Sequence, residues 1–216
     1  MSESPKIYVV IYSLYGHVKT VAEEIKKGIE EAGCEAVLLQ CPETLPAEVL
    51  EKMGAPPKDE GIPLVDVNDL PNADGIMFGI PTRFGMAATQ VKSVLDATGS
   101  LWQKGALVGK PASVFFSTAT QGGGQETTAL TFVTQLTHHG SECVCVCAYS
   151  TPLLFNMDEV HGGSPYGAGT FAGPDGSRMP SELEKNIAKH HGTHFASTCK
   201  ALKLGRAAAA AAATSS

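Results

Sequence analysis

Short apolar runs alternate with amphipathic segments along most of the chain. The run from Ile7 to Ile11 is continuously β-branched, apolar or aromatic, which is typical of a strand covered on both faces. Apolar residues then recur every three or four positions from Val18 to Ala32, which predicts a helix that ends at Gly33. A second strand is expected at Ala36–Leu39. The chain therefore begins with a strand–helix–strand unit.

The alternation resumes after a proline-rich, partly helical excursion between Pro42 and Pro71. The final helix is expected to begin after Ser181, because Ser181 and Glu184 have the spacing of a capping box. Five strands alternating with helices predict a doubly wound α/β fold, a three-layer α/β/α arrangement around a five-stranded parallel sheet. The chain length favours the flavodoxin-like strand order 2-1-3-4-5 over the Rossmann order. The remaining strands are predicted at Gly75–Gly79, Ala112–Phe116 and Cys143–Ala148, and the remaining helices at Ala88–Ala97 and Thr128–Thr137.

A length of 216 residues suits one such domain, which we expect to span residues 1–204. The Ala-rich segment 205–216 has low complexity and is expected to be a disordered tail. The segment from Tyr149 to Pro180 is long, rich in Gly and Pro, and without periodicity. Such a long loop within a compact domain is usually functional or disordered.

Composition and charge exclude several classes of protein. The net charge is −6 and the basic residues are scattered, which argues against nucleic acid as a partner. No apolar run reaches the roughly 20 residues of a membrane span, and the N-terminus does not resemble a signal peptide. We therefore expect a cytoplasmic protein whose six cysteines remain thiols. Cys143, Cys145 and Cys147 lack metal-loop spacing and are expected to be small buried residues on one face of a core strand; no metal site is expected.

Three unusual loops each follow a predicted strand: Ser13–Val18, Pro81–Gly85 and Ser117–Gly124. In a parallel sheet these positions converge on one edge, where ligands bind. The first loop runs directly into a helix, so its free N–H groups and the helix N-terminus favour an anion. It matches neither the dinucleotide nor the Walker A motif, which leaves another phosphate-bearing ligand or an ordinary turn. The other two loops suit a flat heteroaromatic ring, although a triple-glycine loop can equally be a flexible connector.

Six segments in register carry a family likeness. They resemble the WrbA-type NAD(P)H:quinone oxidoreductases, a flavodoxin-like family, from about Ile7 to Leu204. The segments are Ser13-Leu14-Tyr15-Gly16-His17, Gly79-Ile80-Pro81-Thr82-Arg83-Phe84-Gly85, Gly99-Ser100-Leu101-Trp102, Gly122-Gly123-Gly124-Gln125-Glu126-Thr127, His138-His139-Gly140 and Gly162-Gly163-Ser164-Pro165-Tyr166-Gly167-Ala168.

The resemblance implies FMN as the cofactor and NADH or NADPH as the electron donor for two-electron reduction of quinones to quinols. It implies ping-pong kinetics with hydride passing through flavin N5, so that the flavin carries the chemistry and no catalytic side chain is required. It also implies a nicotinamide contact at Tyr15, a quinone contact at Trp102, and a homotetramer in equilibrium with dimers whose sites form where subunits meet. Quinone substrates are compatible with peripheral membrane association. The implied FMN-binding residues are Ser13, Leu14, Tyr15, Gly16, His17, Val18, Pro81, Thr82, Arg83, Phe84, Ser117, Thr118, Ala119, Thr120, Gln121, Gly122 and His138.

Departures from the family pattern leave alternatives open. Ala119 and Gln121 stand where glycine is frequent, and a methyl at Ala119 is tolerated unless its φ is positive. Met86-Ala87-Ala88 lacks an asparagine found in some relatives. Trp102 and His138 could instead be packing residues. A one-electron carrier of the flavodoxin type, or an interaction protein without FMN, would have a similar sequence pattern.

Overall fold

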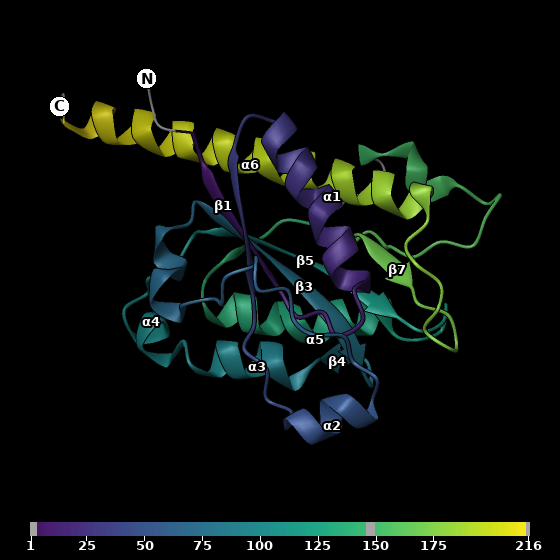
Figure 1. The fold of residues 1–216 in the computed structure, drawn as a ribbon. Helices are drawn as coiled ribbons and strands as arrows, with labels where there is room; N and C mark the ends of the chain where they lie inside the picture. The colour runs from purple at the N-terminus through teal and green to yellow at the C-terminus, as the bar shows by residue number, and fades with distance from the viewer. Residues whose placement is uncertain (1–3, 146–149, 215–216) are drawn as a thin grey trace.

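The computed structural model describes residues 4–145 and 150–214. Figure 1 shows a central sheet with helices on both faces. The strands are β1 (Lys6–Ile11), β2 (Glu35–Gln40), β3 (Gly75–Arg83), β4 (Met86–Ala87), β5 (Pro111–Thr118), β6 (Glu142–Cys143) and β7 (Gly169–Phe171). The α-helices are α1 (His17–Glu31), α2 (Ala47–Lys52), α3 (Thr89–Asp96), α4 (Gly99–Gln103), α5 (Gln125–His138) and α6 (Glu182–Thr214), and the 3₁₀ helices are η1 (Val67–Asn72) and η3 (Pro152–Phe155).

The parallel sheet has the order β2-β1-β3-β5-β6, which confirms the predicted order 2-1-3-4-5. Two short strands share the position of the fifth strand: β6 pairs with the start of β5, and β7 pairs with the end of β5. The sequence predicted a single strand there, at Cys143–Ala148, of which residues 146–148 lie outside the described part of the chain. Strand β7 was missed because it is three residues long within a Gly/Pro-rich segment and shows no periodicity.

Two helical layers sandwich the sheet, with α1 and α6 on one face and α3, α4 and α5 on the other (Figure 1). Successive residues of β1 point to opposite faces, as in any strand. Ile7, Val9 and Ile11 belong to the apolar cluster that includes α1 and α6. Tyr8 and Val10 belong to the cluster that includes α3 and α5. Burial of both faces explains why the strand is continuously apolar.

Helices α1 and α6 pack closely through two glycines. A Cβ added to Gly28 would lie 2.0 Å from the carbonyl oxygen of Lys189, and one added to Gly192 would lie 2.1 Å from that of Ile25. Thr193 Oγ1 donates a hydrogen bond of 3.1 Å to the Gly28 carbonyl oxygen across the same interface. Glycine is required at this crossing because the backbones leave no room for a side chain.

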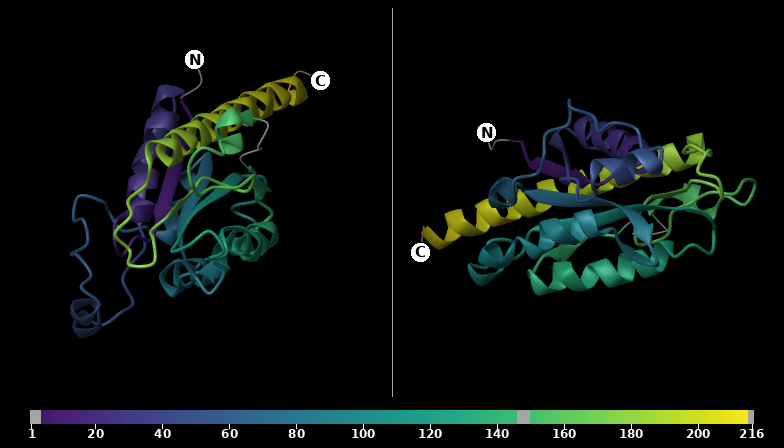
Figure 2. Two further views of the ribbon diagram at one scale, coloured as in Figure 1. Left: turned by 90° about the vertical axis from the view of Figure 1, so that its right-hand side faces the viewer. Right: turned by 60° about the horizontal axis from the view of Figure 1, so that its bottom comes forward.

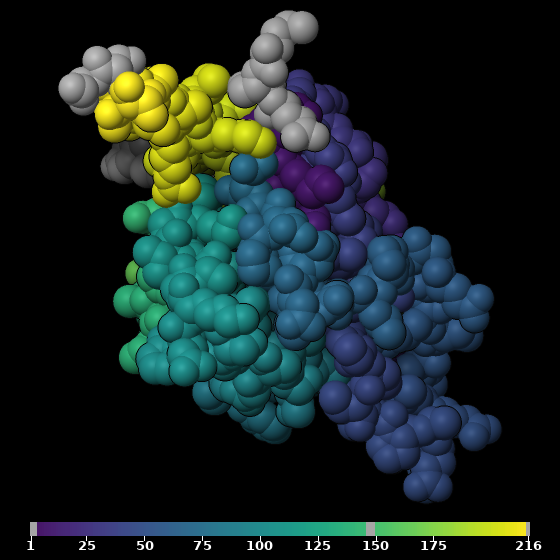
Figure 3. Space-filling model, turned by 90° about the vertical axis from the view of Figure 1, so that its left-hand side faces the viewer, coloured from purple at the N-terminus to yellow at the C-terminus, as the bar shows by residue number. Residues whose placement is uncertain are grey.

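The predicted capping box at the start of α6 is confirmed. The Ser181 N–H donates to Glu184 Oε2 at 2.8 Å, and the Glu184 N–H donates to Ser181 Oγ at 3.3 Å. At its other end α6 continues to Thr214, where the sequence predicted a disordered tail. The helix extends through this alanine run because alanine has the highest helix propensity of all residues. This exposed extension stands out from the body of the molecule (Figure 3).

The segment between β2 and β3 contains α2 and η1, which confirms the predicted partly helical excursion. It projects from one side of the sheet (Figures 2 and 3). Several hydrogen bonds attach it to the body; for example, Tyr12 Oη donates to Glu43 Oε2 at 3.0 Å, and Tyr8 Oη donates to Asp69 Oδ2 at 2.5 Å. None of the described helices is long and apolar enough to cross a membrane.

The prediction that the cysteines of the fifth strand are buried is wrong for Cys143 and Cys145. Cys34, Cys41 and Cys199 are buried thiols, whereas Cys143 and Cys145 are exposed. The periodicity argument assumed that the fifth strand is covered on both faces. Cys143 instead lies on the two-residue edge strand β6 and Cys145 follows it, while Cys147 lies outside the described residues.

Candidate functional site

A cavity of about 520 Å³ opens at the edge of the sheet where β1, β3 and β5 end. All three loops that the sequence analysis singled out contribute to its walls. Two further contributors were not predicted, namely Met53 after α2 and the segment Ala172–Gly176 after β7. From the three predicted loops, the lining residues are Ser13, Leu14, Tyr15, His17, Val18, Pro81, Thr82, Arg83, Ser117, Thr118 and Ala119.

The first loop presents unpaired backbone donors. None of the backbone N–H groups from Ser13 to Val18 donates a hydrogen bond to any residue within 4–145 and 150–214. The next N–H, that of Lys19, donates to Ser13 Oγ at 3.2 Å. These N–H groups lie at the N-terminus of the fifteen-residue helix α1, where the helix dipole favours negative charge. The loop therefore presents the open donors that an anion would need.

Two glycines shape this first loop. Gly16 is the N-cap of α1 with a φ of 93°, a conformation that residues with a side chain rarely adopt. Gly79 lies beneath the loop on β3, where an added Cβ would approach Val18 Cγ1 to 2.7 Å and Phe115 Cζ to 2.5 Å. The absence of a side chain at Gly79 thus allows the start of α1 to settle onto the sheet.

The second loop is the turn of a hairpin between β3 and β4, which pairs Thr82 with Ala87. Thr82 Oγ1 contacts Thr128 Oγ1 of α5 at 2.8 Å, so the hairpin is attached to α5. Arg83 is exposed at the cavity and donates from Nη1 to the Thr82 carbonyl oxygen at 2.9 Å. Phe84, at the tip, has a φ of 53° and a fully exposed side chain that does not line the cavity.

The third loop contributes only its first half to the cavity. Ser117, Thr118 and Ala119 line it, while the predicted residues Thr120, Gln121 and Gly122 are exposed beyond it. Ala119 does not have a positive φ, so its methyl group is accommodated as expected. The glycines are structural as well: Gly124 is the N-cap of α5 with a φ of 92°, and a Cβ on Gly123 would lie 2.8 Å from the Thr120 carbonyl oxygen.

The structure does not bring His138 and Trp102 to the cavity of their own chain. His138 is the last residue of the fourteen-residue helix α5, which begins beside the cavity, so the two are separated by about 20 Å along the helix axis. Trp102 belongs to α4, whose N-cap residue Thr98 contacts His139 Nε2 at 2.8 Å. Helix α4 lies at the opposite edge of the sheet from the loops that follow β1, β3 and β5 (Figure 1). The side chains of Trp102 and His138 are both exposed. His139 is buried, and its pKa is lowered by burial.

The cavity carries few charges. Arg83 supplies a cation, and Asp175 supplies a carboxylate whose pKa is lowered by hydrogen bonds from the backbone N–H and hydroxyl of Ser177. His17 is buried in the wall, and its Nε2 has no hydrogen-bond partner among the described residues. Tyr15 is about half exposed at the mouth, with its hydroxyl donating to the Met53 carbonyl oxygen at 3.1 Å. The site can hold an anionic group at one end and a flat polar group between the loops.

Of the two missed contributors, only one had a signal in the sequence. Gly173-Pro174-Asp175-Gly176 is a recognisable turn motif within the long segment that was expected to be functional. Its position at the cavity follows from β7, whose pairing with β5 was not predicted. Met53 lies in the projecting segment between β2 and β3. The sequence pattern did not indicate where this segment would lie relative to the cavity.

Comparison with known proteins shows the family of the chain. The family model described as NADPH-dependent FMN reductase matches residues 5–144. The chain is 56% identical over 199 residues to Quinone-oxidoreductase QR2 of Triphysaria versicolor, covering 92% of this chain and 97% of that protein. It is 53% identical over 195 residues to the NAD(P)H dehydrogenase (quinone) of Trichlorobacter lovleyi, covering 88% and 95%.

Solved structures agree on the fold. A WrbA-like flavodoxin from Agrobacterium tumefaciens superposes with a TM-score of 0.64 at 23% identity, covering 91% of this chain and 98% of that one. Flavodoxin 2 from Bacillus cereus superposes with a TM-score of 0.59 at 20% identity, covering 89% and 99%. The chain therefore has a flavodoxin-like fold and belongs to the NADPH-dependent FMN reductase family, together with the NAD(P)H quinone oxidoreductases to which it is similar.

Proposed function

We propose that this chain is an FMN-dependent NAD(P)H:quinone oxidoreductase that reduces quinones to quinols by two electrons. One observation carries the proposal: the open amides of Ser13–Val18 lie in a cavity with two further loops, in a chain more than half identical to a named quinone oxidoreductase. The names of the relatives support both the nicotinamide donor and the quinone acceptor.

The residues present fit FMN. Six consecutive unpaired N–H groups at a helix N-terminus suit a phosphate monoester. The cavity volume of about 520 Å³ is within the range of ligand pockets, roughly 300–1,000 Å³. Ser13–Val18 would hold the phosphate, and Pro81–Phe84 with Ser117–Gly122 would hold the ring system. Within these ranges, Gly16 supports the turn, while Phe84, Thr120, Gln121 and Gly122 are exposed and do not line the cavity.

The protein's part in the reaction is to bind and orient. FMN, when bound, supplies the two-electron chemistry, with N5 as the atom through which hydride passes from NADH or NADPH to the quinone. The N–H groups of Ser117–Gly122 would stabilise negative charge beside the ring as preorganised donors. Tyr15 offers an aromatic face at the mouth to a nicotinamide, and Arg83 offers a cation to its phosphates. Because one mouth would serve both donor and acceptor, we expect them to bind in turn, which gives ping-pong kinetics.

Trp102 and His138 would act in a second copy of the chain. Both side chains are exposed and lie at the opposite edge of the sheet from their own cavity, so they could contact a quinone or flavin only across a subunit interface. This placement supports the homotetramer, in equilibrium with dimers, that the family resemblance implies. We also propose a cytoplasmic location, which the free thiols of the described cysteines support. Lipid-dissolved quinones would then bring the protein to membrane surfaces.

The test is steady-state oxidation of NADH and of NADPH by the FMN-loaded protein with benzoquinone as the acceptor. We expect turnover with at least one donor, and parallel lines in double-reciprocal plots at several quinone concentrations. Flavin-free protein is the control. Bound flavin without turnover would contradict the enzyme and favour a one-electron carrier, whereas failure to bind FMN at all would favour an interaction protein.

A further inference from the structure

We propose that Ala172–Gly176 is a fourth wall of the cofactor cavity, and that Glu184 and Arg178 are positioning residues that hold this wall in place. The inference rests on the proposed function, because FMN is the ligand whose binding the wall would serve. It adds a segment and two residues to the three loops on which the proposed site was built.

The fourth wall is attached directly to the third loop. The Ala172 N–H donates to the Thr118 carbonyl oxygen at 2.8 Å, and the Gly173 N–H donates to that of Ala119 at 2.9 Å. These bonds extend the pairing of β7 with β5 beyond the end of the sheet. The wall therefore fixes the backbone of two cavity residues, Thr118 and Ala119, as well as lining the cavity itself.

The residues of the wall form a hydrogen-bonded turn. The Gly176 N–H donates to the Gly173 carbonyl oxygen at 3.2 Å, and the Arg178 N–H donates to that of Ala172 at 2.9 Å. Gly173 and Gly176 have φ values of 80° and 79°, which residues with a side chain rarely adopt. Because the turn is closed between Ala172 and Arg178, a displacement of Arg178 moves the whole wall.

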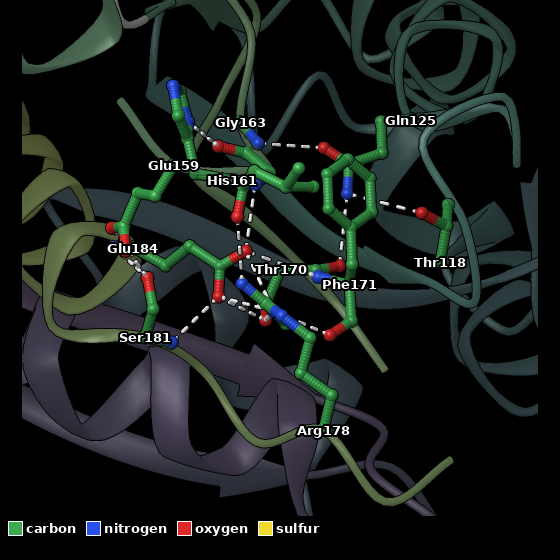
Figure 4. Close-up of polar contacts among 12 residues, drawn as sticks. Thr118, Gln125, Glu159, His161, Gly163, Thr170, Phe171, Arg178, Ser181 and Glu184 are labelled. Carbon is green, nitrogen blue, oxygen red and sulfur yellow. Dashed lines mark hydrogen bonds and ion pairs between the residues drawn. The ribbon is translucent and has the colours of Figure 1, made fainter. Parts of the chain in front are cut away.

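Glu184 is the fixed point to which this turn is anchored (Figure 4). Its side chain is entirely buried in the first turn of α6. Its carboxylate accepts hydrogen bonds from the Gly162 N–H at 2.8 Å, the Thr170 hydroxyl at 2.7 Å and the Ser181 N–H at 2.8 Å. Arg178 Nη1 completes the set, at 3.1 and 2.9 Å from the two carboxylate oxygens. The Phe171 N–H also donates to Glu184 Oε1, at 3.3 Å. A buried carboxylate is stable only when its oxygens are paired in this way, so these five donor groups are held together.

Arg178 connects the anchor to the segments on either side. Its Nη1 also donates to the Phe171 carbonyl oxygen at 2.7 Å, at the end of β7, and its Nη2 donates to that of Val160 at 3.1 Å. The side chain is 31% exposed, so its guanidinium lies between the buried anchor and the surface. One side chain thus joins Val160 and the end of β7 to the turn that precedes α6.

Gln125 links the anchor to the third loop by a second path (Figure 4). Its buried side-chain amide donates from Nε2 to Thr118 Oγ1 at 3.2 Å and to the Thr170 carbonyl oxygen at 3.0 Å. Its Oε1 accepts from the Gly163 N–H at 2.7 Å. The cavity residue Thr118 is therefore connected through Gln125 and Thr170 to Glu184. This network predicts that the cavity is preorganised before FMN binds.

Loss of the anchor should lower the affinity for FMN without removing any residue that lines the cavity. When only a fraction of molecules is competent to bind, the apparent dissociation constant rises by the reciprocal of that fraction. A wall that is in place in about one molecule in ten therefore weakens FMN binding about tenfold.

The experiment measures the Kd of FMN for flavin-free protein by quenching of flavin fluorescence, and records the visible circular dichroism of the bound flavin. We expect Glu184→Gln to raise Kd at least about tenfold and to change the dichroic spectrum. Arg178→Ala should do the same, and Arg178→Lys should recover part of the affinity. The matched control is Glu182→Gln, which removes an ion pair with Lys185 in the same helical turn, where Glu182 is 84% exposed. Its Kd should change less than about twofold, because exposed ion pairs contribute little.

A second pair of variants tests the wall if Glu184→Gln does not fold. Gly173→Ala strains the wall at a φ of 80°, while Gly105→Ala imposes a similar strain at a φ of 62° near α4, away from the cavity. We expect weaker FMN binding only for Gly173→Ala. Unchanged Kd in folded Glu184→Gln or in Gly173→Ala, or an equal loss in the matched control, would overturn the inference and leave the proposed function intact. Failure of the wild-type protein to bind FMN would overturn both.

Discussion

Replacing His191 by glutamine should make the stability of this protein less sensitive to acid. His191 lies in α6 and is entirely buried. Its Nδ1 accepts the Ala168 N–H at 3.3 Å, so Nε2 carries the proton and donates to Ser113 Oγ at 2.7 Å. Burial, with smaller contributions from the neighbouring His194 and His190, lowers the pKa of His191 from 6.5 to about 3.

The magnitude follows from linkage between protonation and folding. The folded protein keeps His191 neutral, whereas the unfolded chain takes up a proton below pH 6.5. The contribution of His191 to stability is therefore fully present above that pH and is lost as the pH falls toward 3. At about pH 5, protonation of the unfolded chain costs the folded state about 2 kcal/mol.

Urea unfolding followed by far-ultraviolet circular dichroism measures this contribution. The wild-type and His191→Gln proteins, both without flavin and at one protein concentration, are compared at about pH 8 and about pH 5. The variant should be less stable at the higher pH, since glutamine cannot reproduce both hydrogen bonds. Between the two pH values, however, the wild type should lose about 2 kcal/mol more than the variant. Equal losses would show that His191 is not held neutral by the fold.

Three further predictions concern the helix crossing, the first loop and the remote residues. Gly192→Ala should lower the free energy of unfolding by more than about 2 kcal/mol because its Cβ would meet the Ile25 carbonyl oxygen. Gly205→Ala, with open space in the same helix, should raise that free energy by about 0.5–1 kcal/mol. A Gly192→Ala protein at least as stable as the wild type in urea unfolding would contradict the packing. Ser13→Ala combined with Gly16→Val should weaken FMN binding at least about tenfold, and an unchanged Kd would mean that the phosphate binds elsewhere. Trp102→Ala should raise the KM for benzoquinone of the assembled enzyme while the Kd of FMN stays within about twofold; a large change in that Kd would contradict its distance from its own cavity.

The sequence pattern was sufficient for the elements that are buried on both faces. Strands β1, β3 and β5 are continuous apolar runs, and their parallel pairing brings the loops after them to one edge. The convergence of Ser13–Val18, Pro81–Arg83 and Ser117–Ala119 on one cavity therefore followed from strand order alone. Residue type then indicated the chemistry, because a loop that opens into a helix leaves its N–H groups unpaired.

The pattern was insufficient where structure depends on contacts between distant segments. Nothing periodic marks β7, which forms only because the edge of β5 is free beyond β6. The exposure of Cys143 and Cys145 follows from the same division of the fifth strand position between two short strands. The position of His138 could have been predicted from the length of α5. A helix that begins at the cavity and has fourteen residues must end at the other edge of the sheet. The family resemblance placed this residue beside a flavin without specifying which copy of the chain supplies it.

An experimental structure of the protein loaded with FMN tests the central claim most directly. We expect the phosphate to accept hydrogen bonds from the backbone N–H groups between Ser13 and Val18, and the ring system to lie between Pro81–Arg83 and Ser117–Ala119. A phosphate bound away from α1, or a flavin bound outside the cavity with these N–H groups still unpaired, would contradict the account.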